Sequence, residues 1–143
     1  MLPDDVLLSI FDFYMIEGFR LHEKQRIEEW ITLTHVCRCW RIVVFQSPLR
    51  LNLRLLCGPT TPARETLDIW PPFPLIIRYV YPIFRDEPSS VDNIIVALKC
   101  NDRVCQVRLN FFSSTQMGYV TDSVAMHQPF PELEDLHLSL LVR

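Results

Sequence analysis

The side chains best suited to chemistry in this chain are five cysteines and four histidines. Cys37 and Cys39 are two residues apart and Cys100 and Cys105 are five apart, so the sequence has no Cys-x-x-Cys pair. Side chains two residues apart on a helix point about 200° from each other, which prevents Cys37 and Cys39 from holding one metal ion. A metal site would need the fold to bring one of three histidines together with the cysteines: His22, His35 or His127. We therefore expect reduced, partly buried cysteines, with no metal and no disulfide.

Catalytic motifs are missing from the sequence. There is no His-Glu-x-x-His and no Gly-x-Ser-x-Gly segment. The three glycines stand alone, so no glycine-rich phosphate loop can form. The adjacent acids Asp4 and Asp5, and likewise Glu28 and Glu29, are typical of solvated helix ends rather than of a general acid and base. We expect a protein that is not an enzyme and carries no cofactor.

Composition narrows the class further. The chain has 143 residues, of which 49% are hydrophobic and 22% charged, as in ordinary globular domains. The net charge of −3 argues against a nucleic-acid partner. No apolar run approaches about 18 residues, and the N-terminus is acidic, so we expect neither a membrane span nor a signal peptide. These features favour a location in the cytoplasm, the nucleus or both.

The elements that must position any site begin with a helix over residues 2–14. Pro3 suits the first helical position, and two acids follow it in the first turn. One apolar stripe holds five residues of this segment: Val6, Leu7, Ile10, Phe11 and Tyr14. Three more apolar residues lie outside that stripe: Leu8, Phe13 and Met15. A helix that is apolar nearly all round is covered on more than one face, so we expect a partner here.

Two further helices and a strand are expected before the middle of the chain. The apolar spacing predicts helices over residues 26–35 and 38–45, the second ending before Ser47-Pro48. Alternating leucines then predict a strand over residues 49–56. Five arginines fall in a window without an acid, and we interpret them as solvated rather than as one basic patch: Arg38, Arg41, Arg50, Arg54 and Arg64.

These segments carry a family resemblance. Leu2-Pro3-x-Asp5-Val6-x-Leu8-x-Ile10-Phe11, followed by Leu33-x-x-Val36-Cys37-x-x-Trp40-Arg41-x-x-Val44 and Ser47-Pro48, resembles an F-box. The chain departs from the family pattern in having a longer connection between the first two helices and Asp5 where Glu is commoner. The resemblance covers residues 2–51 and implies three short helices that dock on a Skp-type adaptor of a cullin-RING (SCF) ubiquitin ligase. It implies these adaptor-binding residues: Leu2, Pro3, Asp5, Val6, Leu8, Ile10, Trp40 and Pro48.

The middle of the chain is rich in proline. Residues 57–88 hold seven of the eleven prolines, so we expect no helix there and only a short strand around Phe73, Leu75 and Ile77. Ser89-x-x-Asp92 is similar to a capping box and starts a predicted short helix that ends near Asn101.

The last third of the chain contains two similar segments. Val104-x-x-Val107-x-Leu109 and Leu133-x-x-Leu136-x-Leu138 start 29 residues apart and both fit the core of a leucine-rich repeat. Trp70-x-x-Phe73-x-Leu75 is a candidate irregular unit, 34 residues before the first. A plain α+β sheet is the alternative. His137 points away from the core in either arrangement, where it is solvated or touches a ligand.

Together these patterns predict an α+β protein with an F-box at 1–51, a proline-rich connection at 52–90 and an incomplete repeat region at 91–143. The apolar end of the chain leads us to expect a truncated product. The whole order resembles the F-box proteins that mushroom-forming fungi encode in large sets. The expected function is an adaptor that presents an unidentified substrate protein to the ligase. The alternatives are a repeat-based interaction or scaffold module without a ligase role and, on the cysteines alone, a small metal or redox protein.

Overall fold

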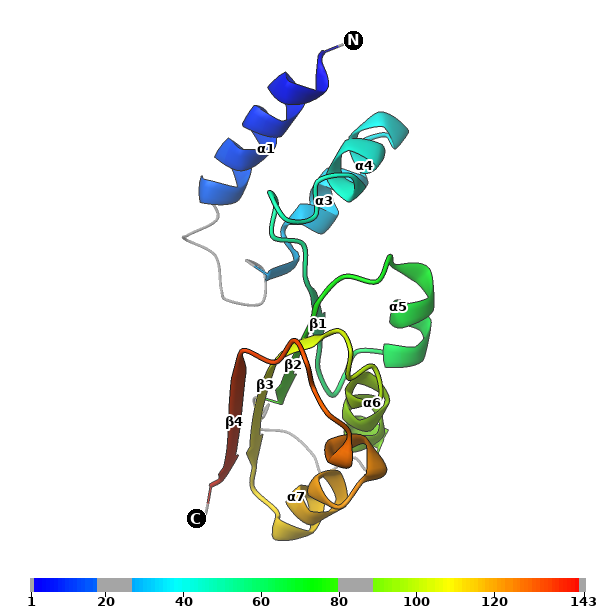
Figure 1. Cartoon of the computed structure of the whole chain (residues 1–143), viewed down its shortest axis with the longest axis vertical. Coiled ribbons are helices and arrows are strands. Elements are labelled where there is room, and N and C mark those ends of the chain that lie inside the picture. The colour runs from blue at the N-terminus through cyan, green and yellow to red at the C-terminus, as the bar shows by residue number, and fades with distance from the viewer. Residues whose placement is uncertain (1, 18–26, 80–88, 142–143) are drawn as a thin grey trace. The chain divides into compact units, whose positions relative to one another are not determined.

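The computed structural model describes residues 2–17, 27–79 and 89–141, and it contains both helices and strands (Figure 1). The chain forms two compact units, residues 1–55 and residues 56–143. Residues 56–79, from the proline-rich stretch, therefore fold with residues 89–141. The mixed α+β class expected from the sequence is confirmed.

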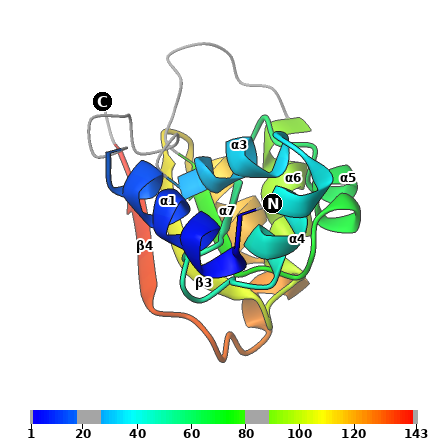
Figure 2. The same cartoon turned by 90° about the horizontal axis from the view of Figure 1, so that it is seen from above.

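The first unit is helical. Its described elements are α1 (Asp4–Glu17), α3 (Trp30–Thr34) and α4 (Arg38–Phe45). Pro3 immediately precedes α1, and its carbonyl accepts hydrogen bonds from the Val6 and Leu7 amides at 3.1 Å. Figure 2 shows α1 beside α4, and the Phe11 and Trp40 rings meet edge to face with centroids 4.8 Å apart.

Trp30 lies at the centre of the first unit. It is fully buried, its ring faces that of Phe45, and its Nε1 donates to the Arg54 carbonyl at 3.0 Å. Burial of an indole is compatible with a stable core when its N–H has such a partner. The apolar side chains buried with it come from all parts of the unit: Leu7, Phe11, Ile27, Leu33, Val43, Val44, Leu51, Leu53 and Leu55.

The strand predicted over residues 49–56 is wrong for most of its length. The chain turns after α4, and β1 covers only Leu55–Cys57. Asn52 has a positive φ of 51°, its amide donates to the Leu49 carbonyl, and the Leu53 amide donates to the Pro48 carbonyl. These are the two bonds of a Schellman motif, which closes a helical turn with a left-handed residue. Asn tolerates that conformation, so it ends the turn where the leucine alternation suggested an extended chain.

The second unit contains a helix that the prolines seemed to exclude. Helix α5 (Ala63–Ile69) lies between Pro62, which occupies its N-cap, and Pro71. The expectation of no helix in residues 57–88 is therefore wrong. Prolines are compatible with the position just before a helix and the segment just after it, and this seven-residue helix contains none itself.

Four strands form one sheet in the order β1–β2–β3–β4, where β2 is Leu75–Tyr79, β3 is Val104–Phe111 and β4 is Asp135–Leu140. The β2–β3 and β3–β4 pairs are parallel. Val107 lies beside Leu136 and Leu109 beside Leu138, so the two similar segments pair with the 29-residue offset read from the sequence.

The proposed third copy, Trp70-x-x-Phe73-x-Leu75, is placed wrongly. Ile77 pairs with Val107 and Tyr79 with Leu109, so the matching strand starts at Leu75 and the offset is about 30 residues. The pairing shifts by one residue between Leu75 and Ile76 because Cys105 forms a bulge. The prolines delay the strand, and Arg103 holds the segment before it by donating to the Phe73 carbonyl at 3.1 Å and the Pro71 carbonyl at 3.4 Å.

Helices cover one face of this sheet. Figures 1 and 2 show α5, α6 (Ser89–Leu98) and α7 (Ser114–Thr121) on the same side, followed by the short 3₁₀ helix η2 (Val124–His127). Helix α6 contacts β2 and α7 contacts β3. The core between them is apolar and includes Ile77, Val91, Ile94, Ala97, Leu98, Val107, Leu109, Phe111 and Val120.

Candidate functional site

Helix α1 leaves a stripe of apolar side chains in solvent. Its inner side is fixed by Leu7 and Phe11, which are 3% and 0% exposed. The exposed apolar residues recur at helical spacing on another side and form what we call the α1 stripe: Leu2, Val6, Ile10, Phe13 and Tyr14. Val6 and Ile10 are both 43% exposed, and Phe13 is 68% exposed. A row of this kind marks a contact surface more often than isolated exposed leucines do.

The predicted adaptor-binding residues of this helix are not all on the α1 stripe. Leu2, Val6 and Ile10 lie on it, and Pro3 is exposed just before the helix. Leu8 is half-buried on another side of α1. Asp5 is exposed one turn before Ser9, on the polar side of the helix.

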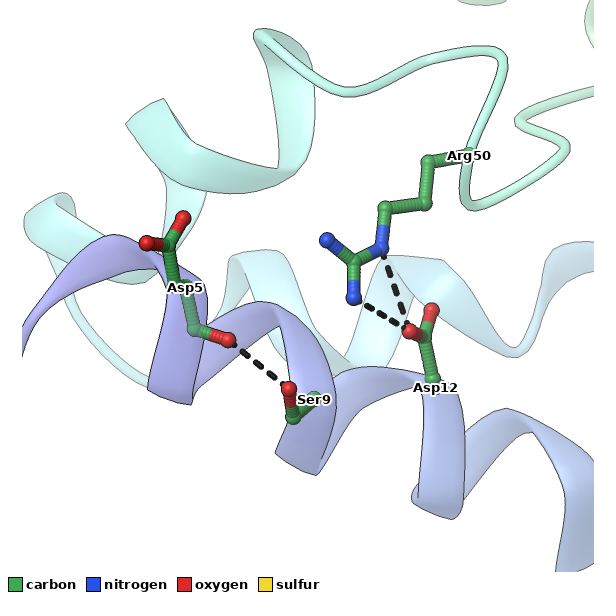
Figure 3. A network of polar contacts seen from close by, with 4 residues as sticks. All are labelled: Asp5, Ser9, Asp12 and Arg50. Carbon is green, nitrogen blue, oxygen red and sulfur yellow. Dashed lines mark hydrogen bonds and ion pairs between the residues drawn. The ribbon is translucent and has the colours of Figure 1, made fainter.

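That polar side is held by an ion pair. Arg50 Nη2 donates to Asp12 Oδ2 at 2.6 Å and Arg50 Nε donates to the same oxygen at 3.1 Å (Figure 3). Ser9 Oγ donates to the Asp5 carbonyl at 2.9 Å one turn earlier. The hydrogen bond to Asp12, together with the charges of Asp12 and Asp5, raises the pKa of Arg50. Asp5 therefore belongs to the acidic surroundings of Arg50.

This ion pair also bears on the run of five arginines. Arg50 binds Asp12, and Arg41 Nε donates to the Thr34 carbonyl at 3.0 Å. Arg64 belongs to the second unit. Arg41 and Arg50 are thus exposed side chains that bind groups of their own unit.

Of the other two predicted site residues, Trp40 lies in α4 and Pro48 follows that helix. Trp40 is half-buried because one side of its ring packs on Phe11. Cys37 is the N-cap of α4, and its sulfur accepts a hydrogen bond from the Trp40 amide at 3.5 Å. Pro48 is half-buried and supplies the carbonyl that closes the turn with Leu53. The Cys37–Trp40 spacing therefore has a capping role that the sequence reading missed.

Two exposed apolar residues are new to the candidate surface. Phe13 lies on the α1 stripe, and Ile42 on α4 is 46% exposed. The sequence gives an indication for Phe13, because this apolar residue lies outside the stripe that contains the buried Phe11. Ile42 had no comparable signal, because its neighbours Val43 and Val44 are buried and equally apolar.

The cysteines do not gather into a centre. All five carry free thiols, and Cys57 and Cys105 are buried, the latter donating to the Leu75 carbonyl at 3.3 Å. Within residues 2–17, 27–79 and 89–141, no group of three or more His, Cys, Asp or Glu residues is placed to hold a metal ion. His22, one of the histidines considered for such a site, lies outside the described residues.

Compared with the models of known protein families, with curated proteins and with solved structures, the chain has no significant match. In the described part of the chain, no helix combines the length and the apolar composition that crossing a bilayer requires.

Proposed function

We propose that the first unit is an F-box and that the α1 stripe docks on a Skp-type adaptor of a cullin-RING (SCF) ubiquitin ligase. The proposal joins two independent supports. One is the resemblance of residues 2–51 to the F-box pattern. The other, which carries the proposal, is a helix whose inner side is already buried while Val6, Ile10 and Phe13 remain in solvent.

The second unit is proposed to be the leucine-rich-repeat-like part that holds a substrate protein. The support is the regular offset of 29 residues between β3 and β4, with a helical segment between the strands. In such an arrangement each unit adds one strand to a shared sheet, and the face without helices is left for a partner.

The mechanism of this adaptor is proximity rather than catalysis. Binding the ligase through one unit and a substrate through the other converts their encounter into an intramolecular event at high effective concentration. The chain itself then needs no catalytic residue and no cofactor. This function places the protein in the cytoplasm, the nucleus or both.

One observation favours a second candidate, an interaction or scaffold module without a ligase role. The second unit has its own sheet and its own core, so it can bind a partner without any contribution from α1. Capture of a Skp-type adaptor by the full-length chain separates the two candidates.

The test uses the double variant Pro3→Ala and Val6→Asp in the full chain, co-expressed with a tagged Skp-type adaptor. A carboxylate at Val6 enters a dry contact without a partner, which costs about 3 kcal/mol or more. Each 1.4 kcal/mol is about tenfold in affinity, so we expect capture of the variant to fall by roughly a hundredfold or more. Because Val6 is 43% exposed, the substitution should leave the core of the first unit folded.

Val124→Asp is the matched control, since it makes the same change at a valine of η2 that is 75% exposed. It should retain full capture, and circular dichroism should show that both variants are folded. If the folded Pro3→Ala, Val6→Asp variant is captured as well as the unmodified chain, the F-box proposal fails.

A further inference from the structure

The leucines on the helix side of β4 are left uncovered. The register places three leucines of β4, which we call the leucine row, beside three buried residues of β3. The pairs are Val107 with Leu136, Leu109 with Leu138, and Phe111 with Leu140. The β3 residues are at most 1% exposed, whereas Leu136 is 52% and Leu140 38% exposed, and Leu138 is half-buried. The well-covered part of the apolar core therefore ends at β3, and the leucine row extends beyond it into solvent.

The position of β4 in the sheet explains this exposure. Helix α6 contacts β2 and α7 contacts β3, so the helices pack over the preceding strands. Strand β4 is the last in the sheet order and pairs with β3 on one side only, at the outer edge seen in Figure 1. Among the described residues no strand lies on its other side. Such an edge presents backbone N–H and C=O groups that have no partner in the ladder.

The usual protections of a strand edge are missing from β4. Soluble proteins protect an exposed edge with lysine, proline, a bulge or a covering segment. The six residues of β4 include neither lysine nor proline, and their register with β3 has no shift. The one carboxylate, Asp135, lies at the start of the strand and accepts hydrogen bonds from Gln106 Nε2 at 2.8 Å and Arg108 Nε at 2.7 Å. The edge is therefore suited to pairing with another strand.

The side chains of β4 follow the same chemical order in both directions from Leu138. Leu136 and Leu140 lie two residues away on the helix side, and His137 and Ser139 lie one residue away on the polar side. A two-fold interface needs this self-complementarity, because both subunits use the same surface. Antiparallel pairing of two copies about Leu138 sets each member of the leucine row opposite a leucine, and it sets His137 opposite the second copy's Ser139. Moving the axis by one residue in either direction leaves one member of the row without a leucine opposite it.

We propose that β4 pairs with β4 of a second copy, antiparallel and with the two-fold axis at Leu138, so that two four-stranded sheets become one continuous sheet. The pairing supplies hydrogen-bond partners to both edges and brings the two leucine rows together, with opposite β-carbons about 4.5–5.5 Å apart. One six-residue strand from each copy buries less than the about 1,200 Å² of a standard interface, so the dimer is weak and depends on concentration. All the residues involved belong to the second unit, so the inference is independent of the F-box proposal.

Disulfide trapping in the full chain tests both the partner and the register. Cys37, Cys39 and Cys100, the thiols that are not buried, are first replaced by serine, which preserves the cap of α4 at position 37. Leu138→Cys is then added and the protein is mildly oxidised at tens of micromolar. Opposite Cα atoms of an antiparallel pair are about 4.5–5.5 Å apart, which a disulfide can span. We expect most of the chain to become a covalent dimer, with the linkage at position 138 identified by mass spectrometry.

His137→Cys in the same background is the matched control. This position is more exposed than Leu138, but its counterpart in the second copy lies diagonally across the pair. Because diagonal neighbours are about 7–8 Å apart, cross-linking should be at least about tenfold slower than for Leu138→Cys. Leu136→Cys and Leu140→Cys give a second check that leaves Leu138 in place. Neither should cross-link by itself, whereas an oxidised mixture of the two should form the mixed dimer.

Circular dichroism confirms that each variant is folded before oxidation. The proposal fails if folded Leu138→Cys protein stays monomeric and the mixture of Leu136→Cys and Leu140→Cys chains forms no mixed dimer. It also fails if His137→Cys cross-links as fast as Leu138→Cys, because that result indicates random collision and not a fixed register. A Leu138→Cys chain that forms disulfides with other proteins of the expression host and not with itself would show that a second copy is not the occupant of this edge.

Discussion

Glu29 is a buried carboxylate at the start of α3, and it has no side-chain capping bond to that helix. Burial raises its pKa above the ordinary value of 4.5. The folded state therefore holds this proton more tightly than the unfolded state does. The contribution of Glu29 to the free energy of unfolding is fully present below the pKa of the unfolded state. It is lost as the pH rises through the raised pKa of the folded state.

Glu29→Gln should accordingly stabilise the first unit at neutral pH, and its advantage should shrink as the pH falls toward the unfolded pKa. Urea denaturation followed by tryptophan fluorescence at several pH values measures this difference. Glu132→Gln, in an exposed turn, controls for the loss of one negative charge. A gain for Glu29→Gln that is the same at every pH would contradict the role of the buried charge.

The sequence shows that α1 has more apolar residues than one buried side of a helix can hold. It does not show which of them face the core and which face solvent. The spacing assigns four residues of similar hydrophobicity to one stripe: Val6, Leu7, Ile10 and Phe11. The structure buries Leu7 and Phe11 and leaves Val6 and Ile10 in solvent. Which residues are buried depends on where Trp40 of α4 packs on α1. This is a tertiary contact, and no pattern within residues 2–14 predicts it.

Among the elements, the turn after α4 depends on one backbone conformation. Asn52 has a φ of 51°, where a residue with a β-carbon other than Asn or Asp is strained. Asn52→Ala should lower the stability of the first unit by about 1 kcal/mol, whereas Asn52→Gly should change it by less than about 0.5 kcal/mol. Midpoints of urea denaturation compare the two variants.

The glycine variant makes that comparison specific, because it removes the same side chain while keeping access to the left-handed conformation. Equal losses for Ala and Gly would mean that the side chain of Asn52, and not its backbone, stabilises the turn.

Much of the element order was predictable, and the errors share a cause. The spacing of Val107 and Leu136 predicted the strand pairing because each strand repeats the same inward positions. The sequence pattern does not predict helix α5 or the turn at Asn52, because the prolines and leucines there indicate a helix-free stretch and a strand. Pro62 instead marks a boundary, and Leu49, 94% exposed, belongs to a turn. The candidate unit at Trp70 was misplaced because the prolines delay the strand until Leu75, and the shift at Cys105 accounts for only one residue of the difference.

For the molecule as a whole, two apolar surfaces predict self-association. The α1 stripe is one. The other is β4, which has a neighbouring strand on one side only within the described sheet and leaves Leu136 52% exposed. An open strand edge beside exposed leucines favours edge-to-edge pairing of copies. We expect the isolated chain to be poorly soluble, and co-expression with a Skp-type adaptor to improve its recovery by covering the α1 stripe.

Size-exclusion chromatography with light scattering measures this behaviour. Leu136→Lys should reduce the aggregated fraction severalfold, since charge on an edge strand opposes pairing. Tyr119→Lys on α7, at a similarly exposed position away from the edge, is the control. A stable, monodisperse monomer of the unmodified chain without the adaptor would count against both surfaces.

The nearly equal sequence separation between successive paired strands also has a consequence for the kinetics of folding. Each pairing in the β2–β3–β4 part of the sheet closes a loop of about the same length, 29 or 30 residues. Loop closure therefore costs nearly the same entropy at each step, and no strand waits for a partner from a distant part of the sequence. A ribosome that adds about 5–20 residues per second would release one new strand every few seconds. This sheet is thus suited to assembly in the order of synthesis, with each strand docking on the one made just before it.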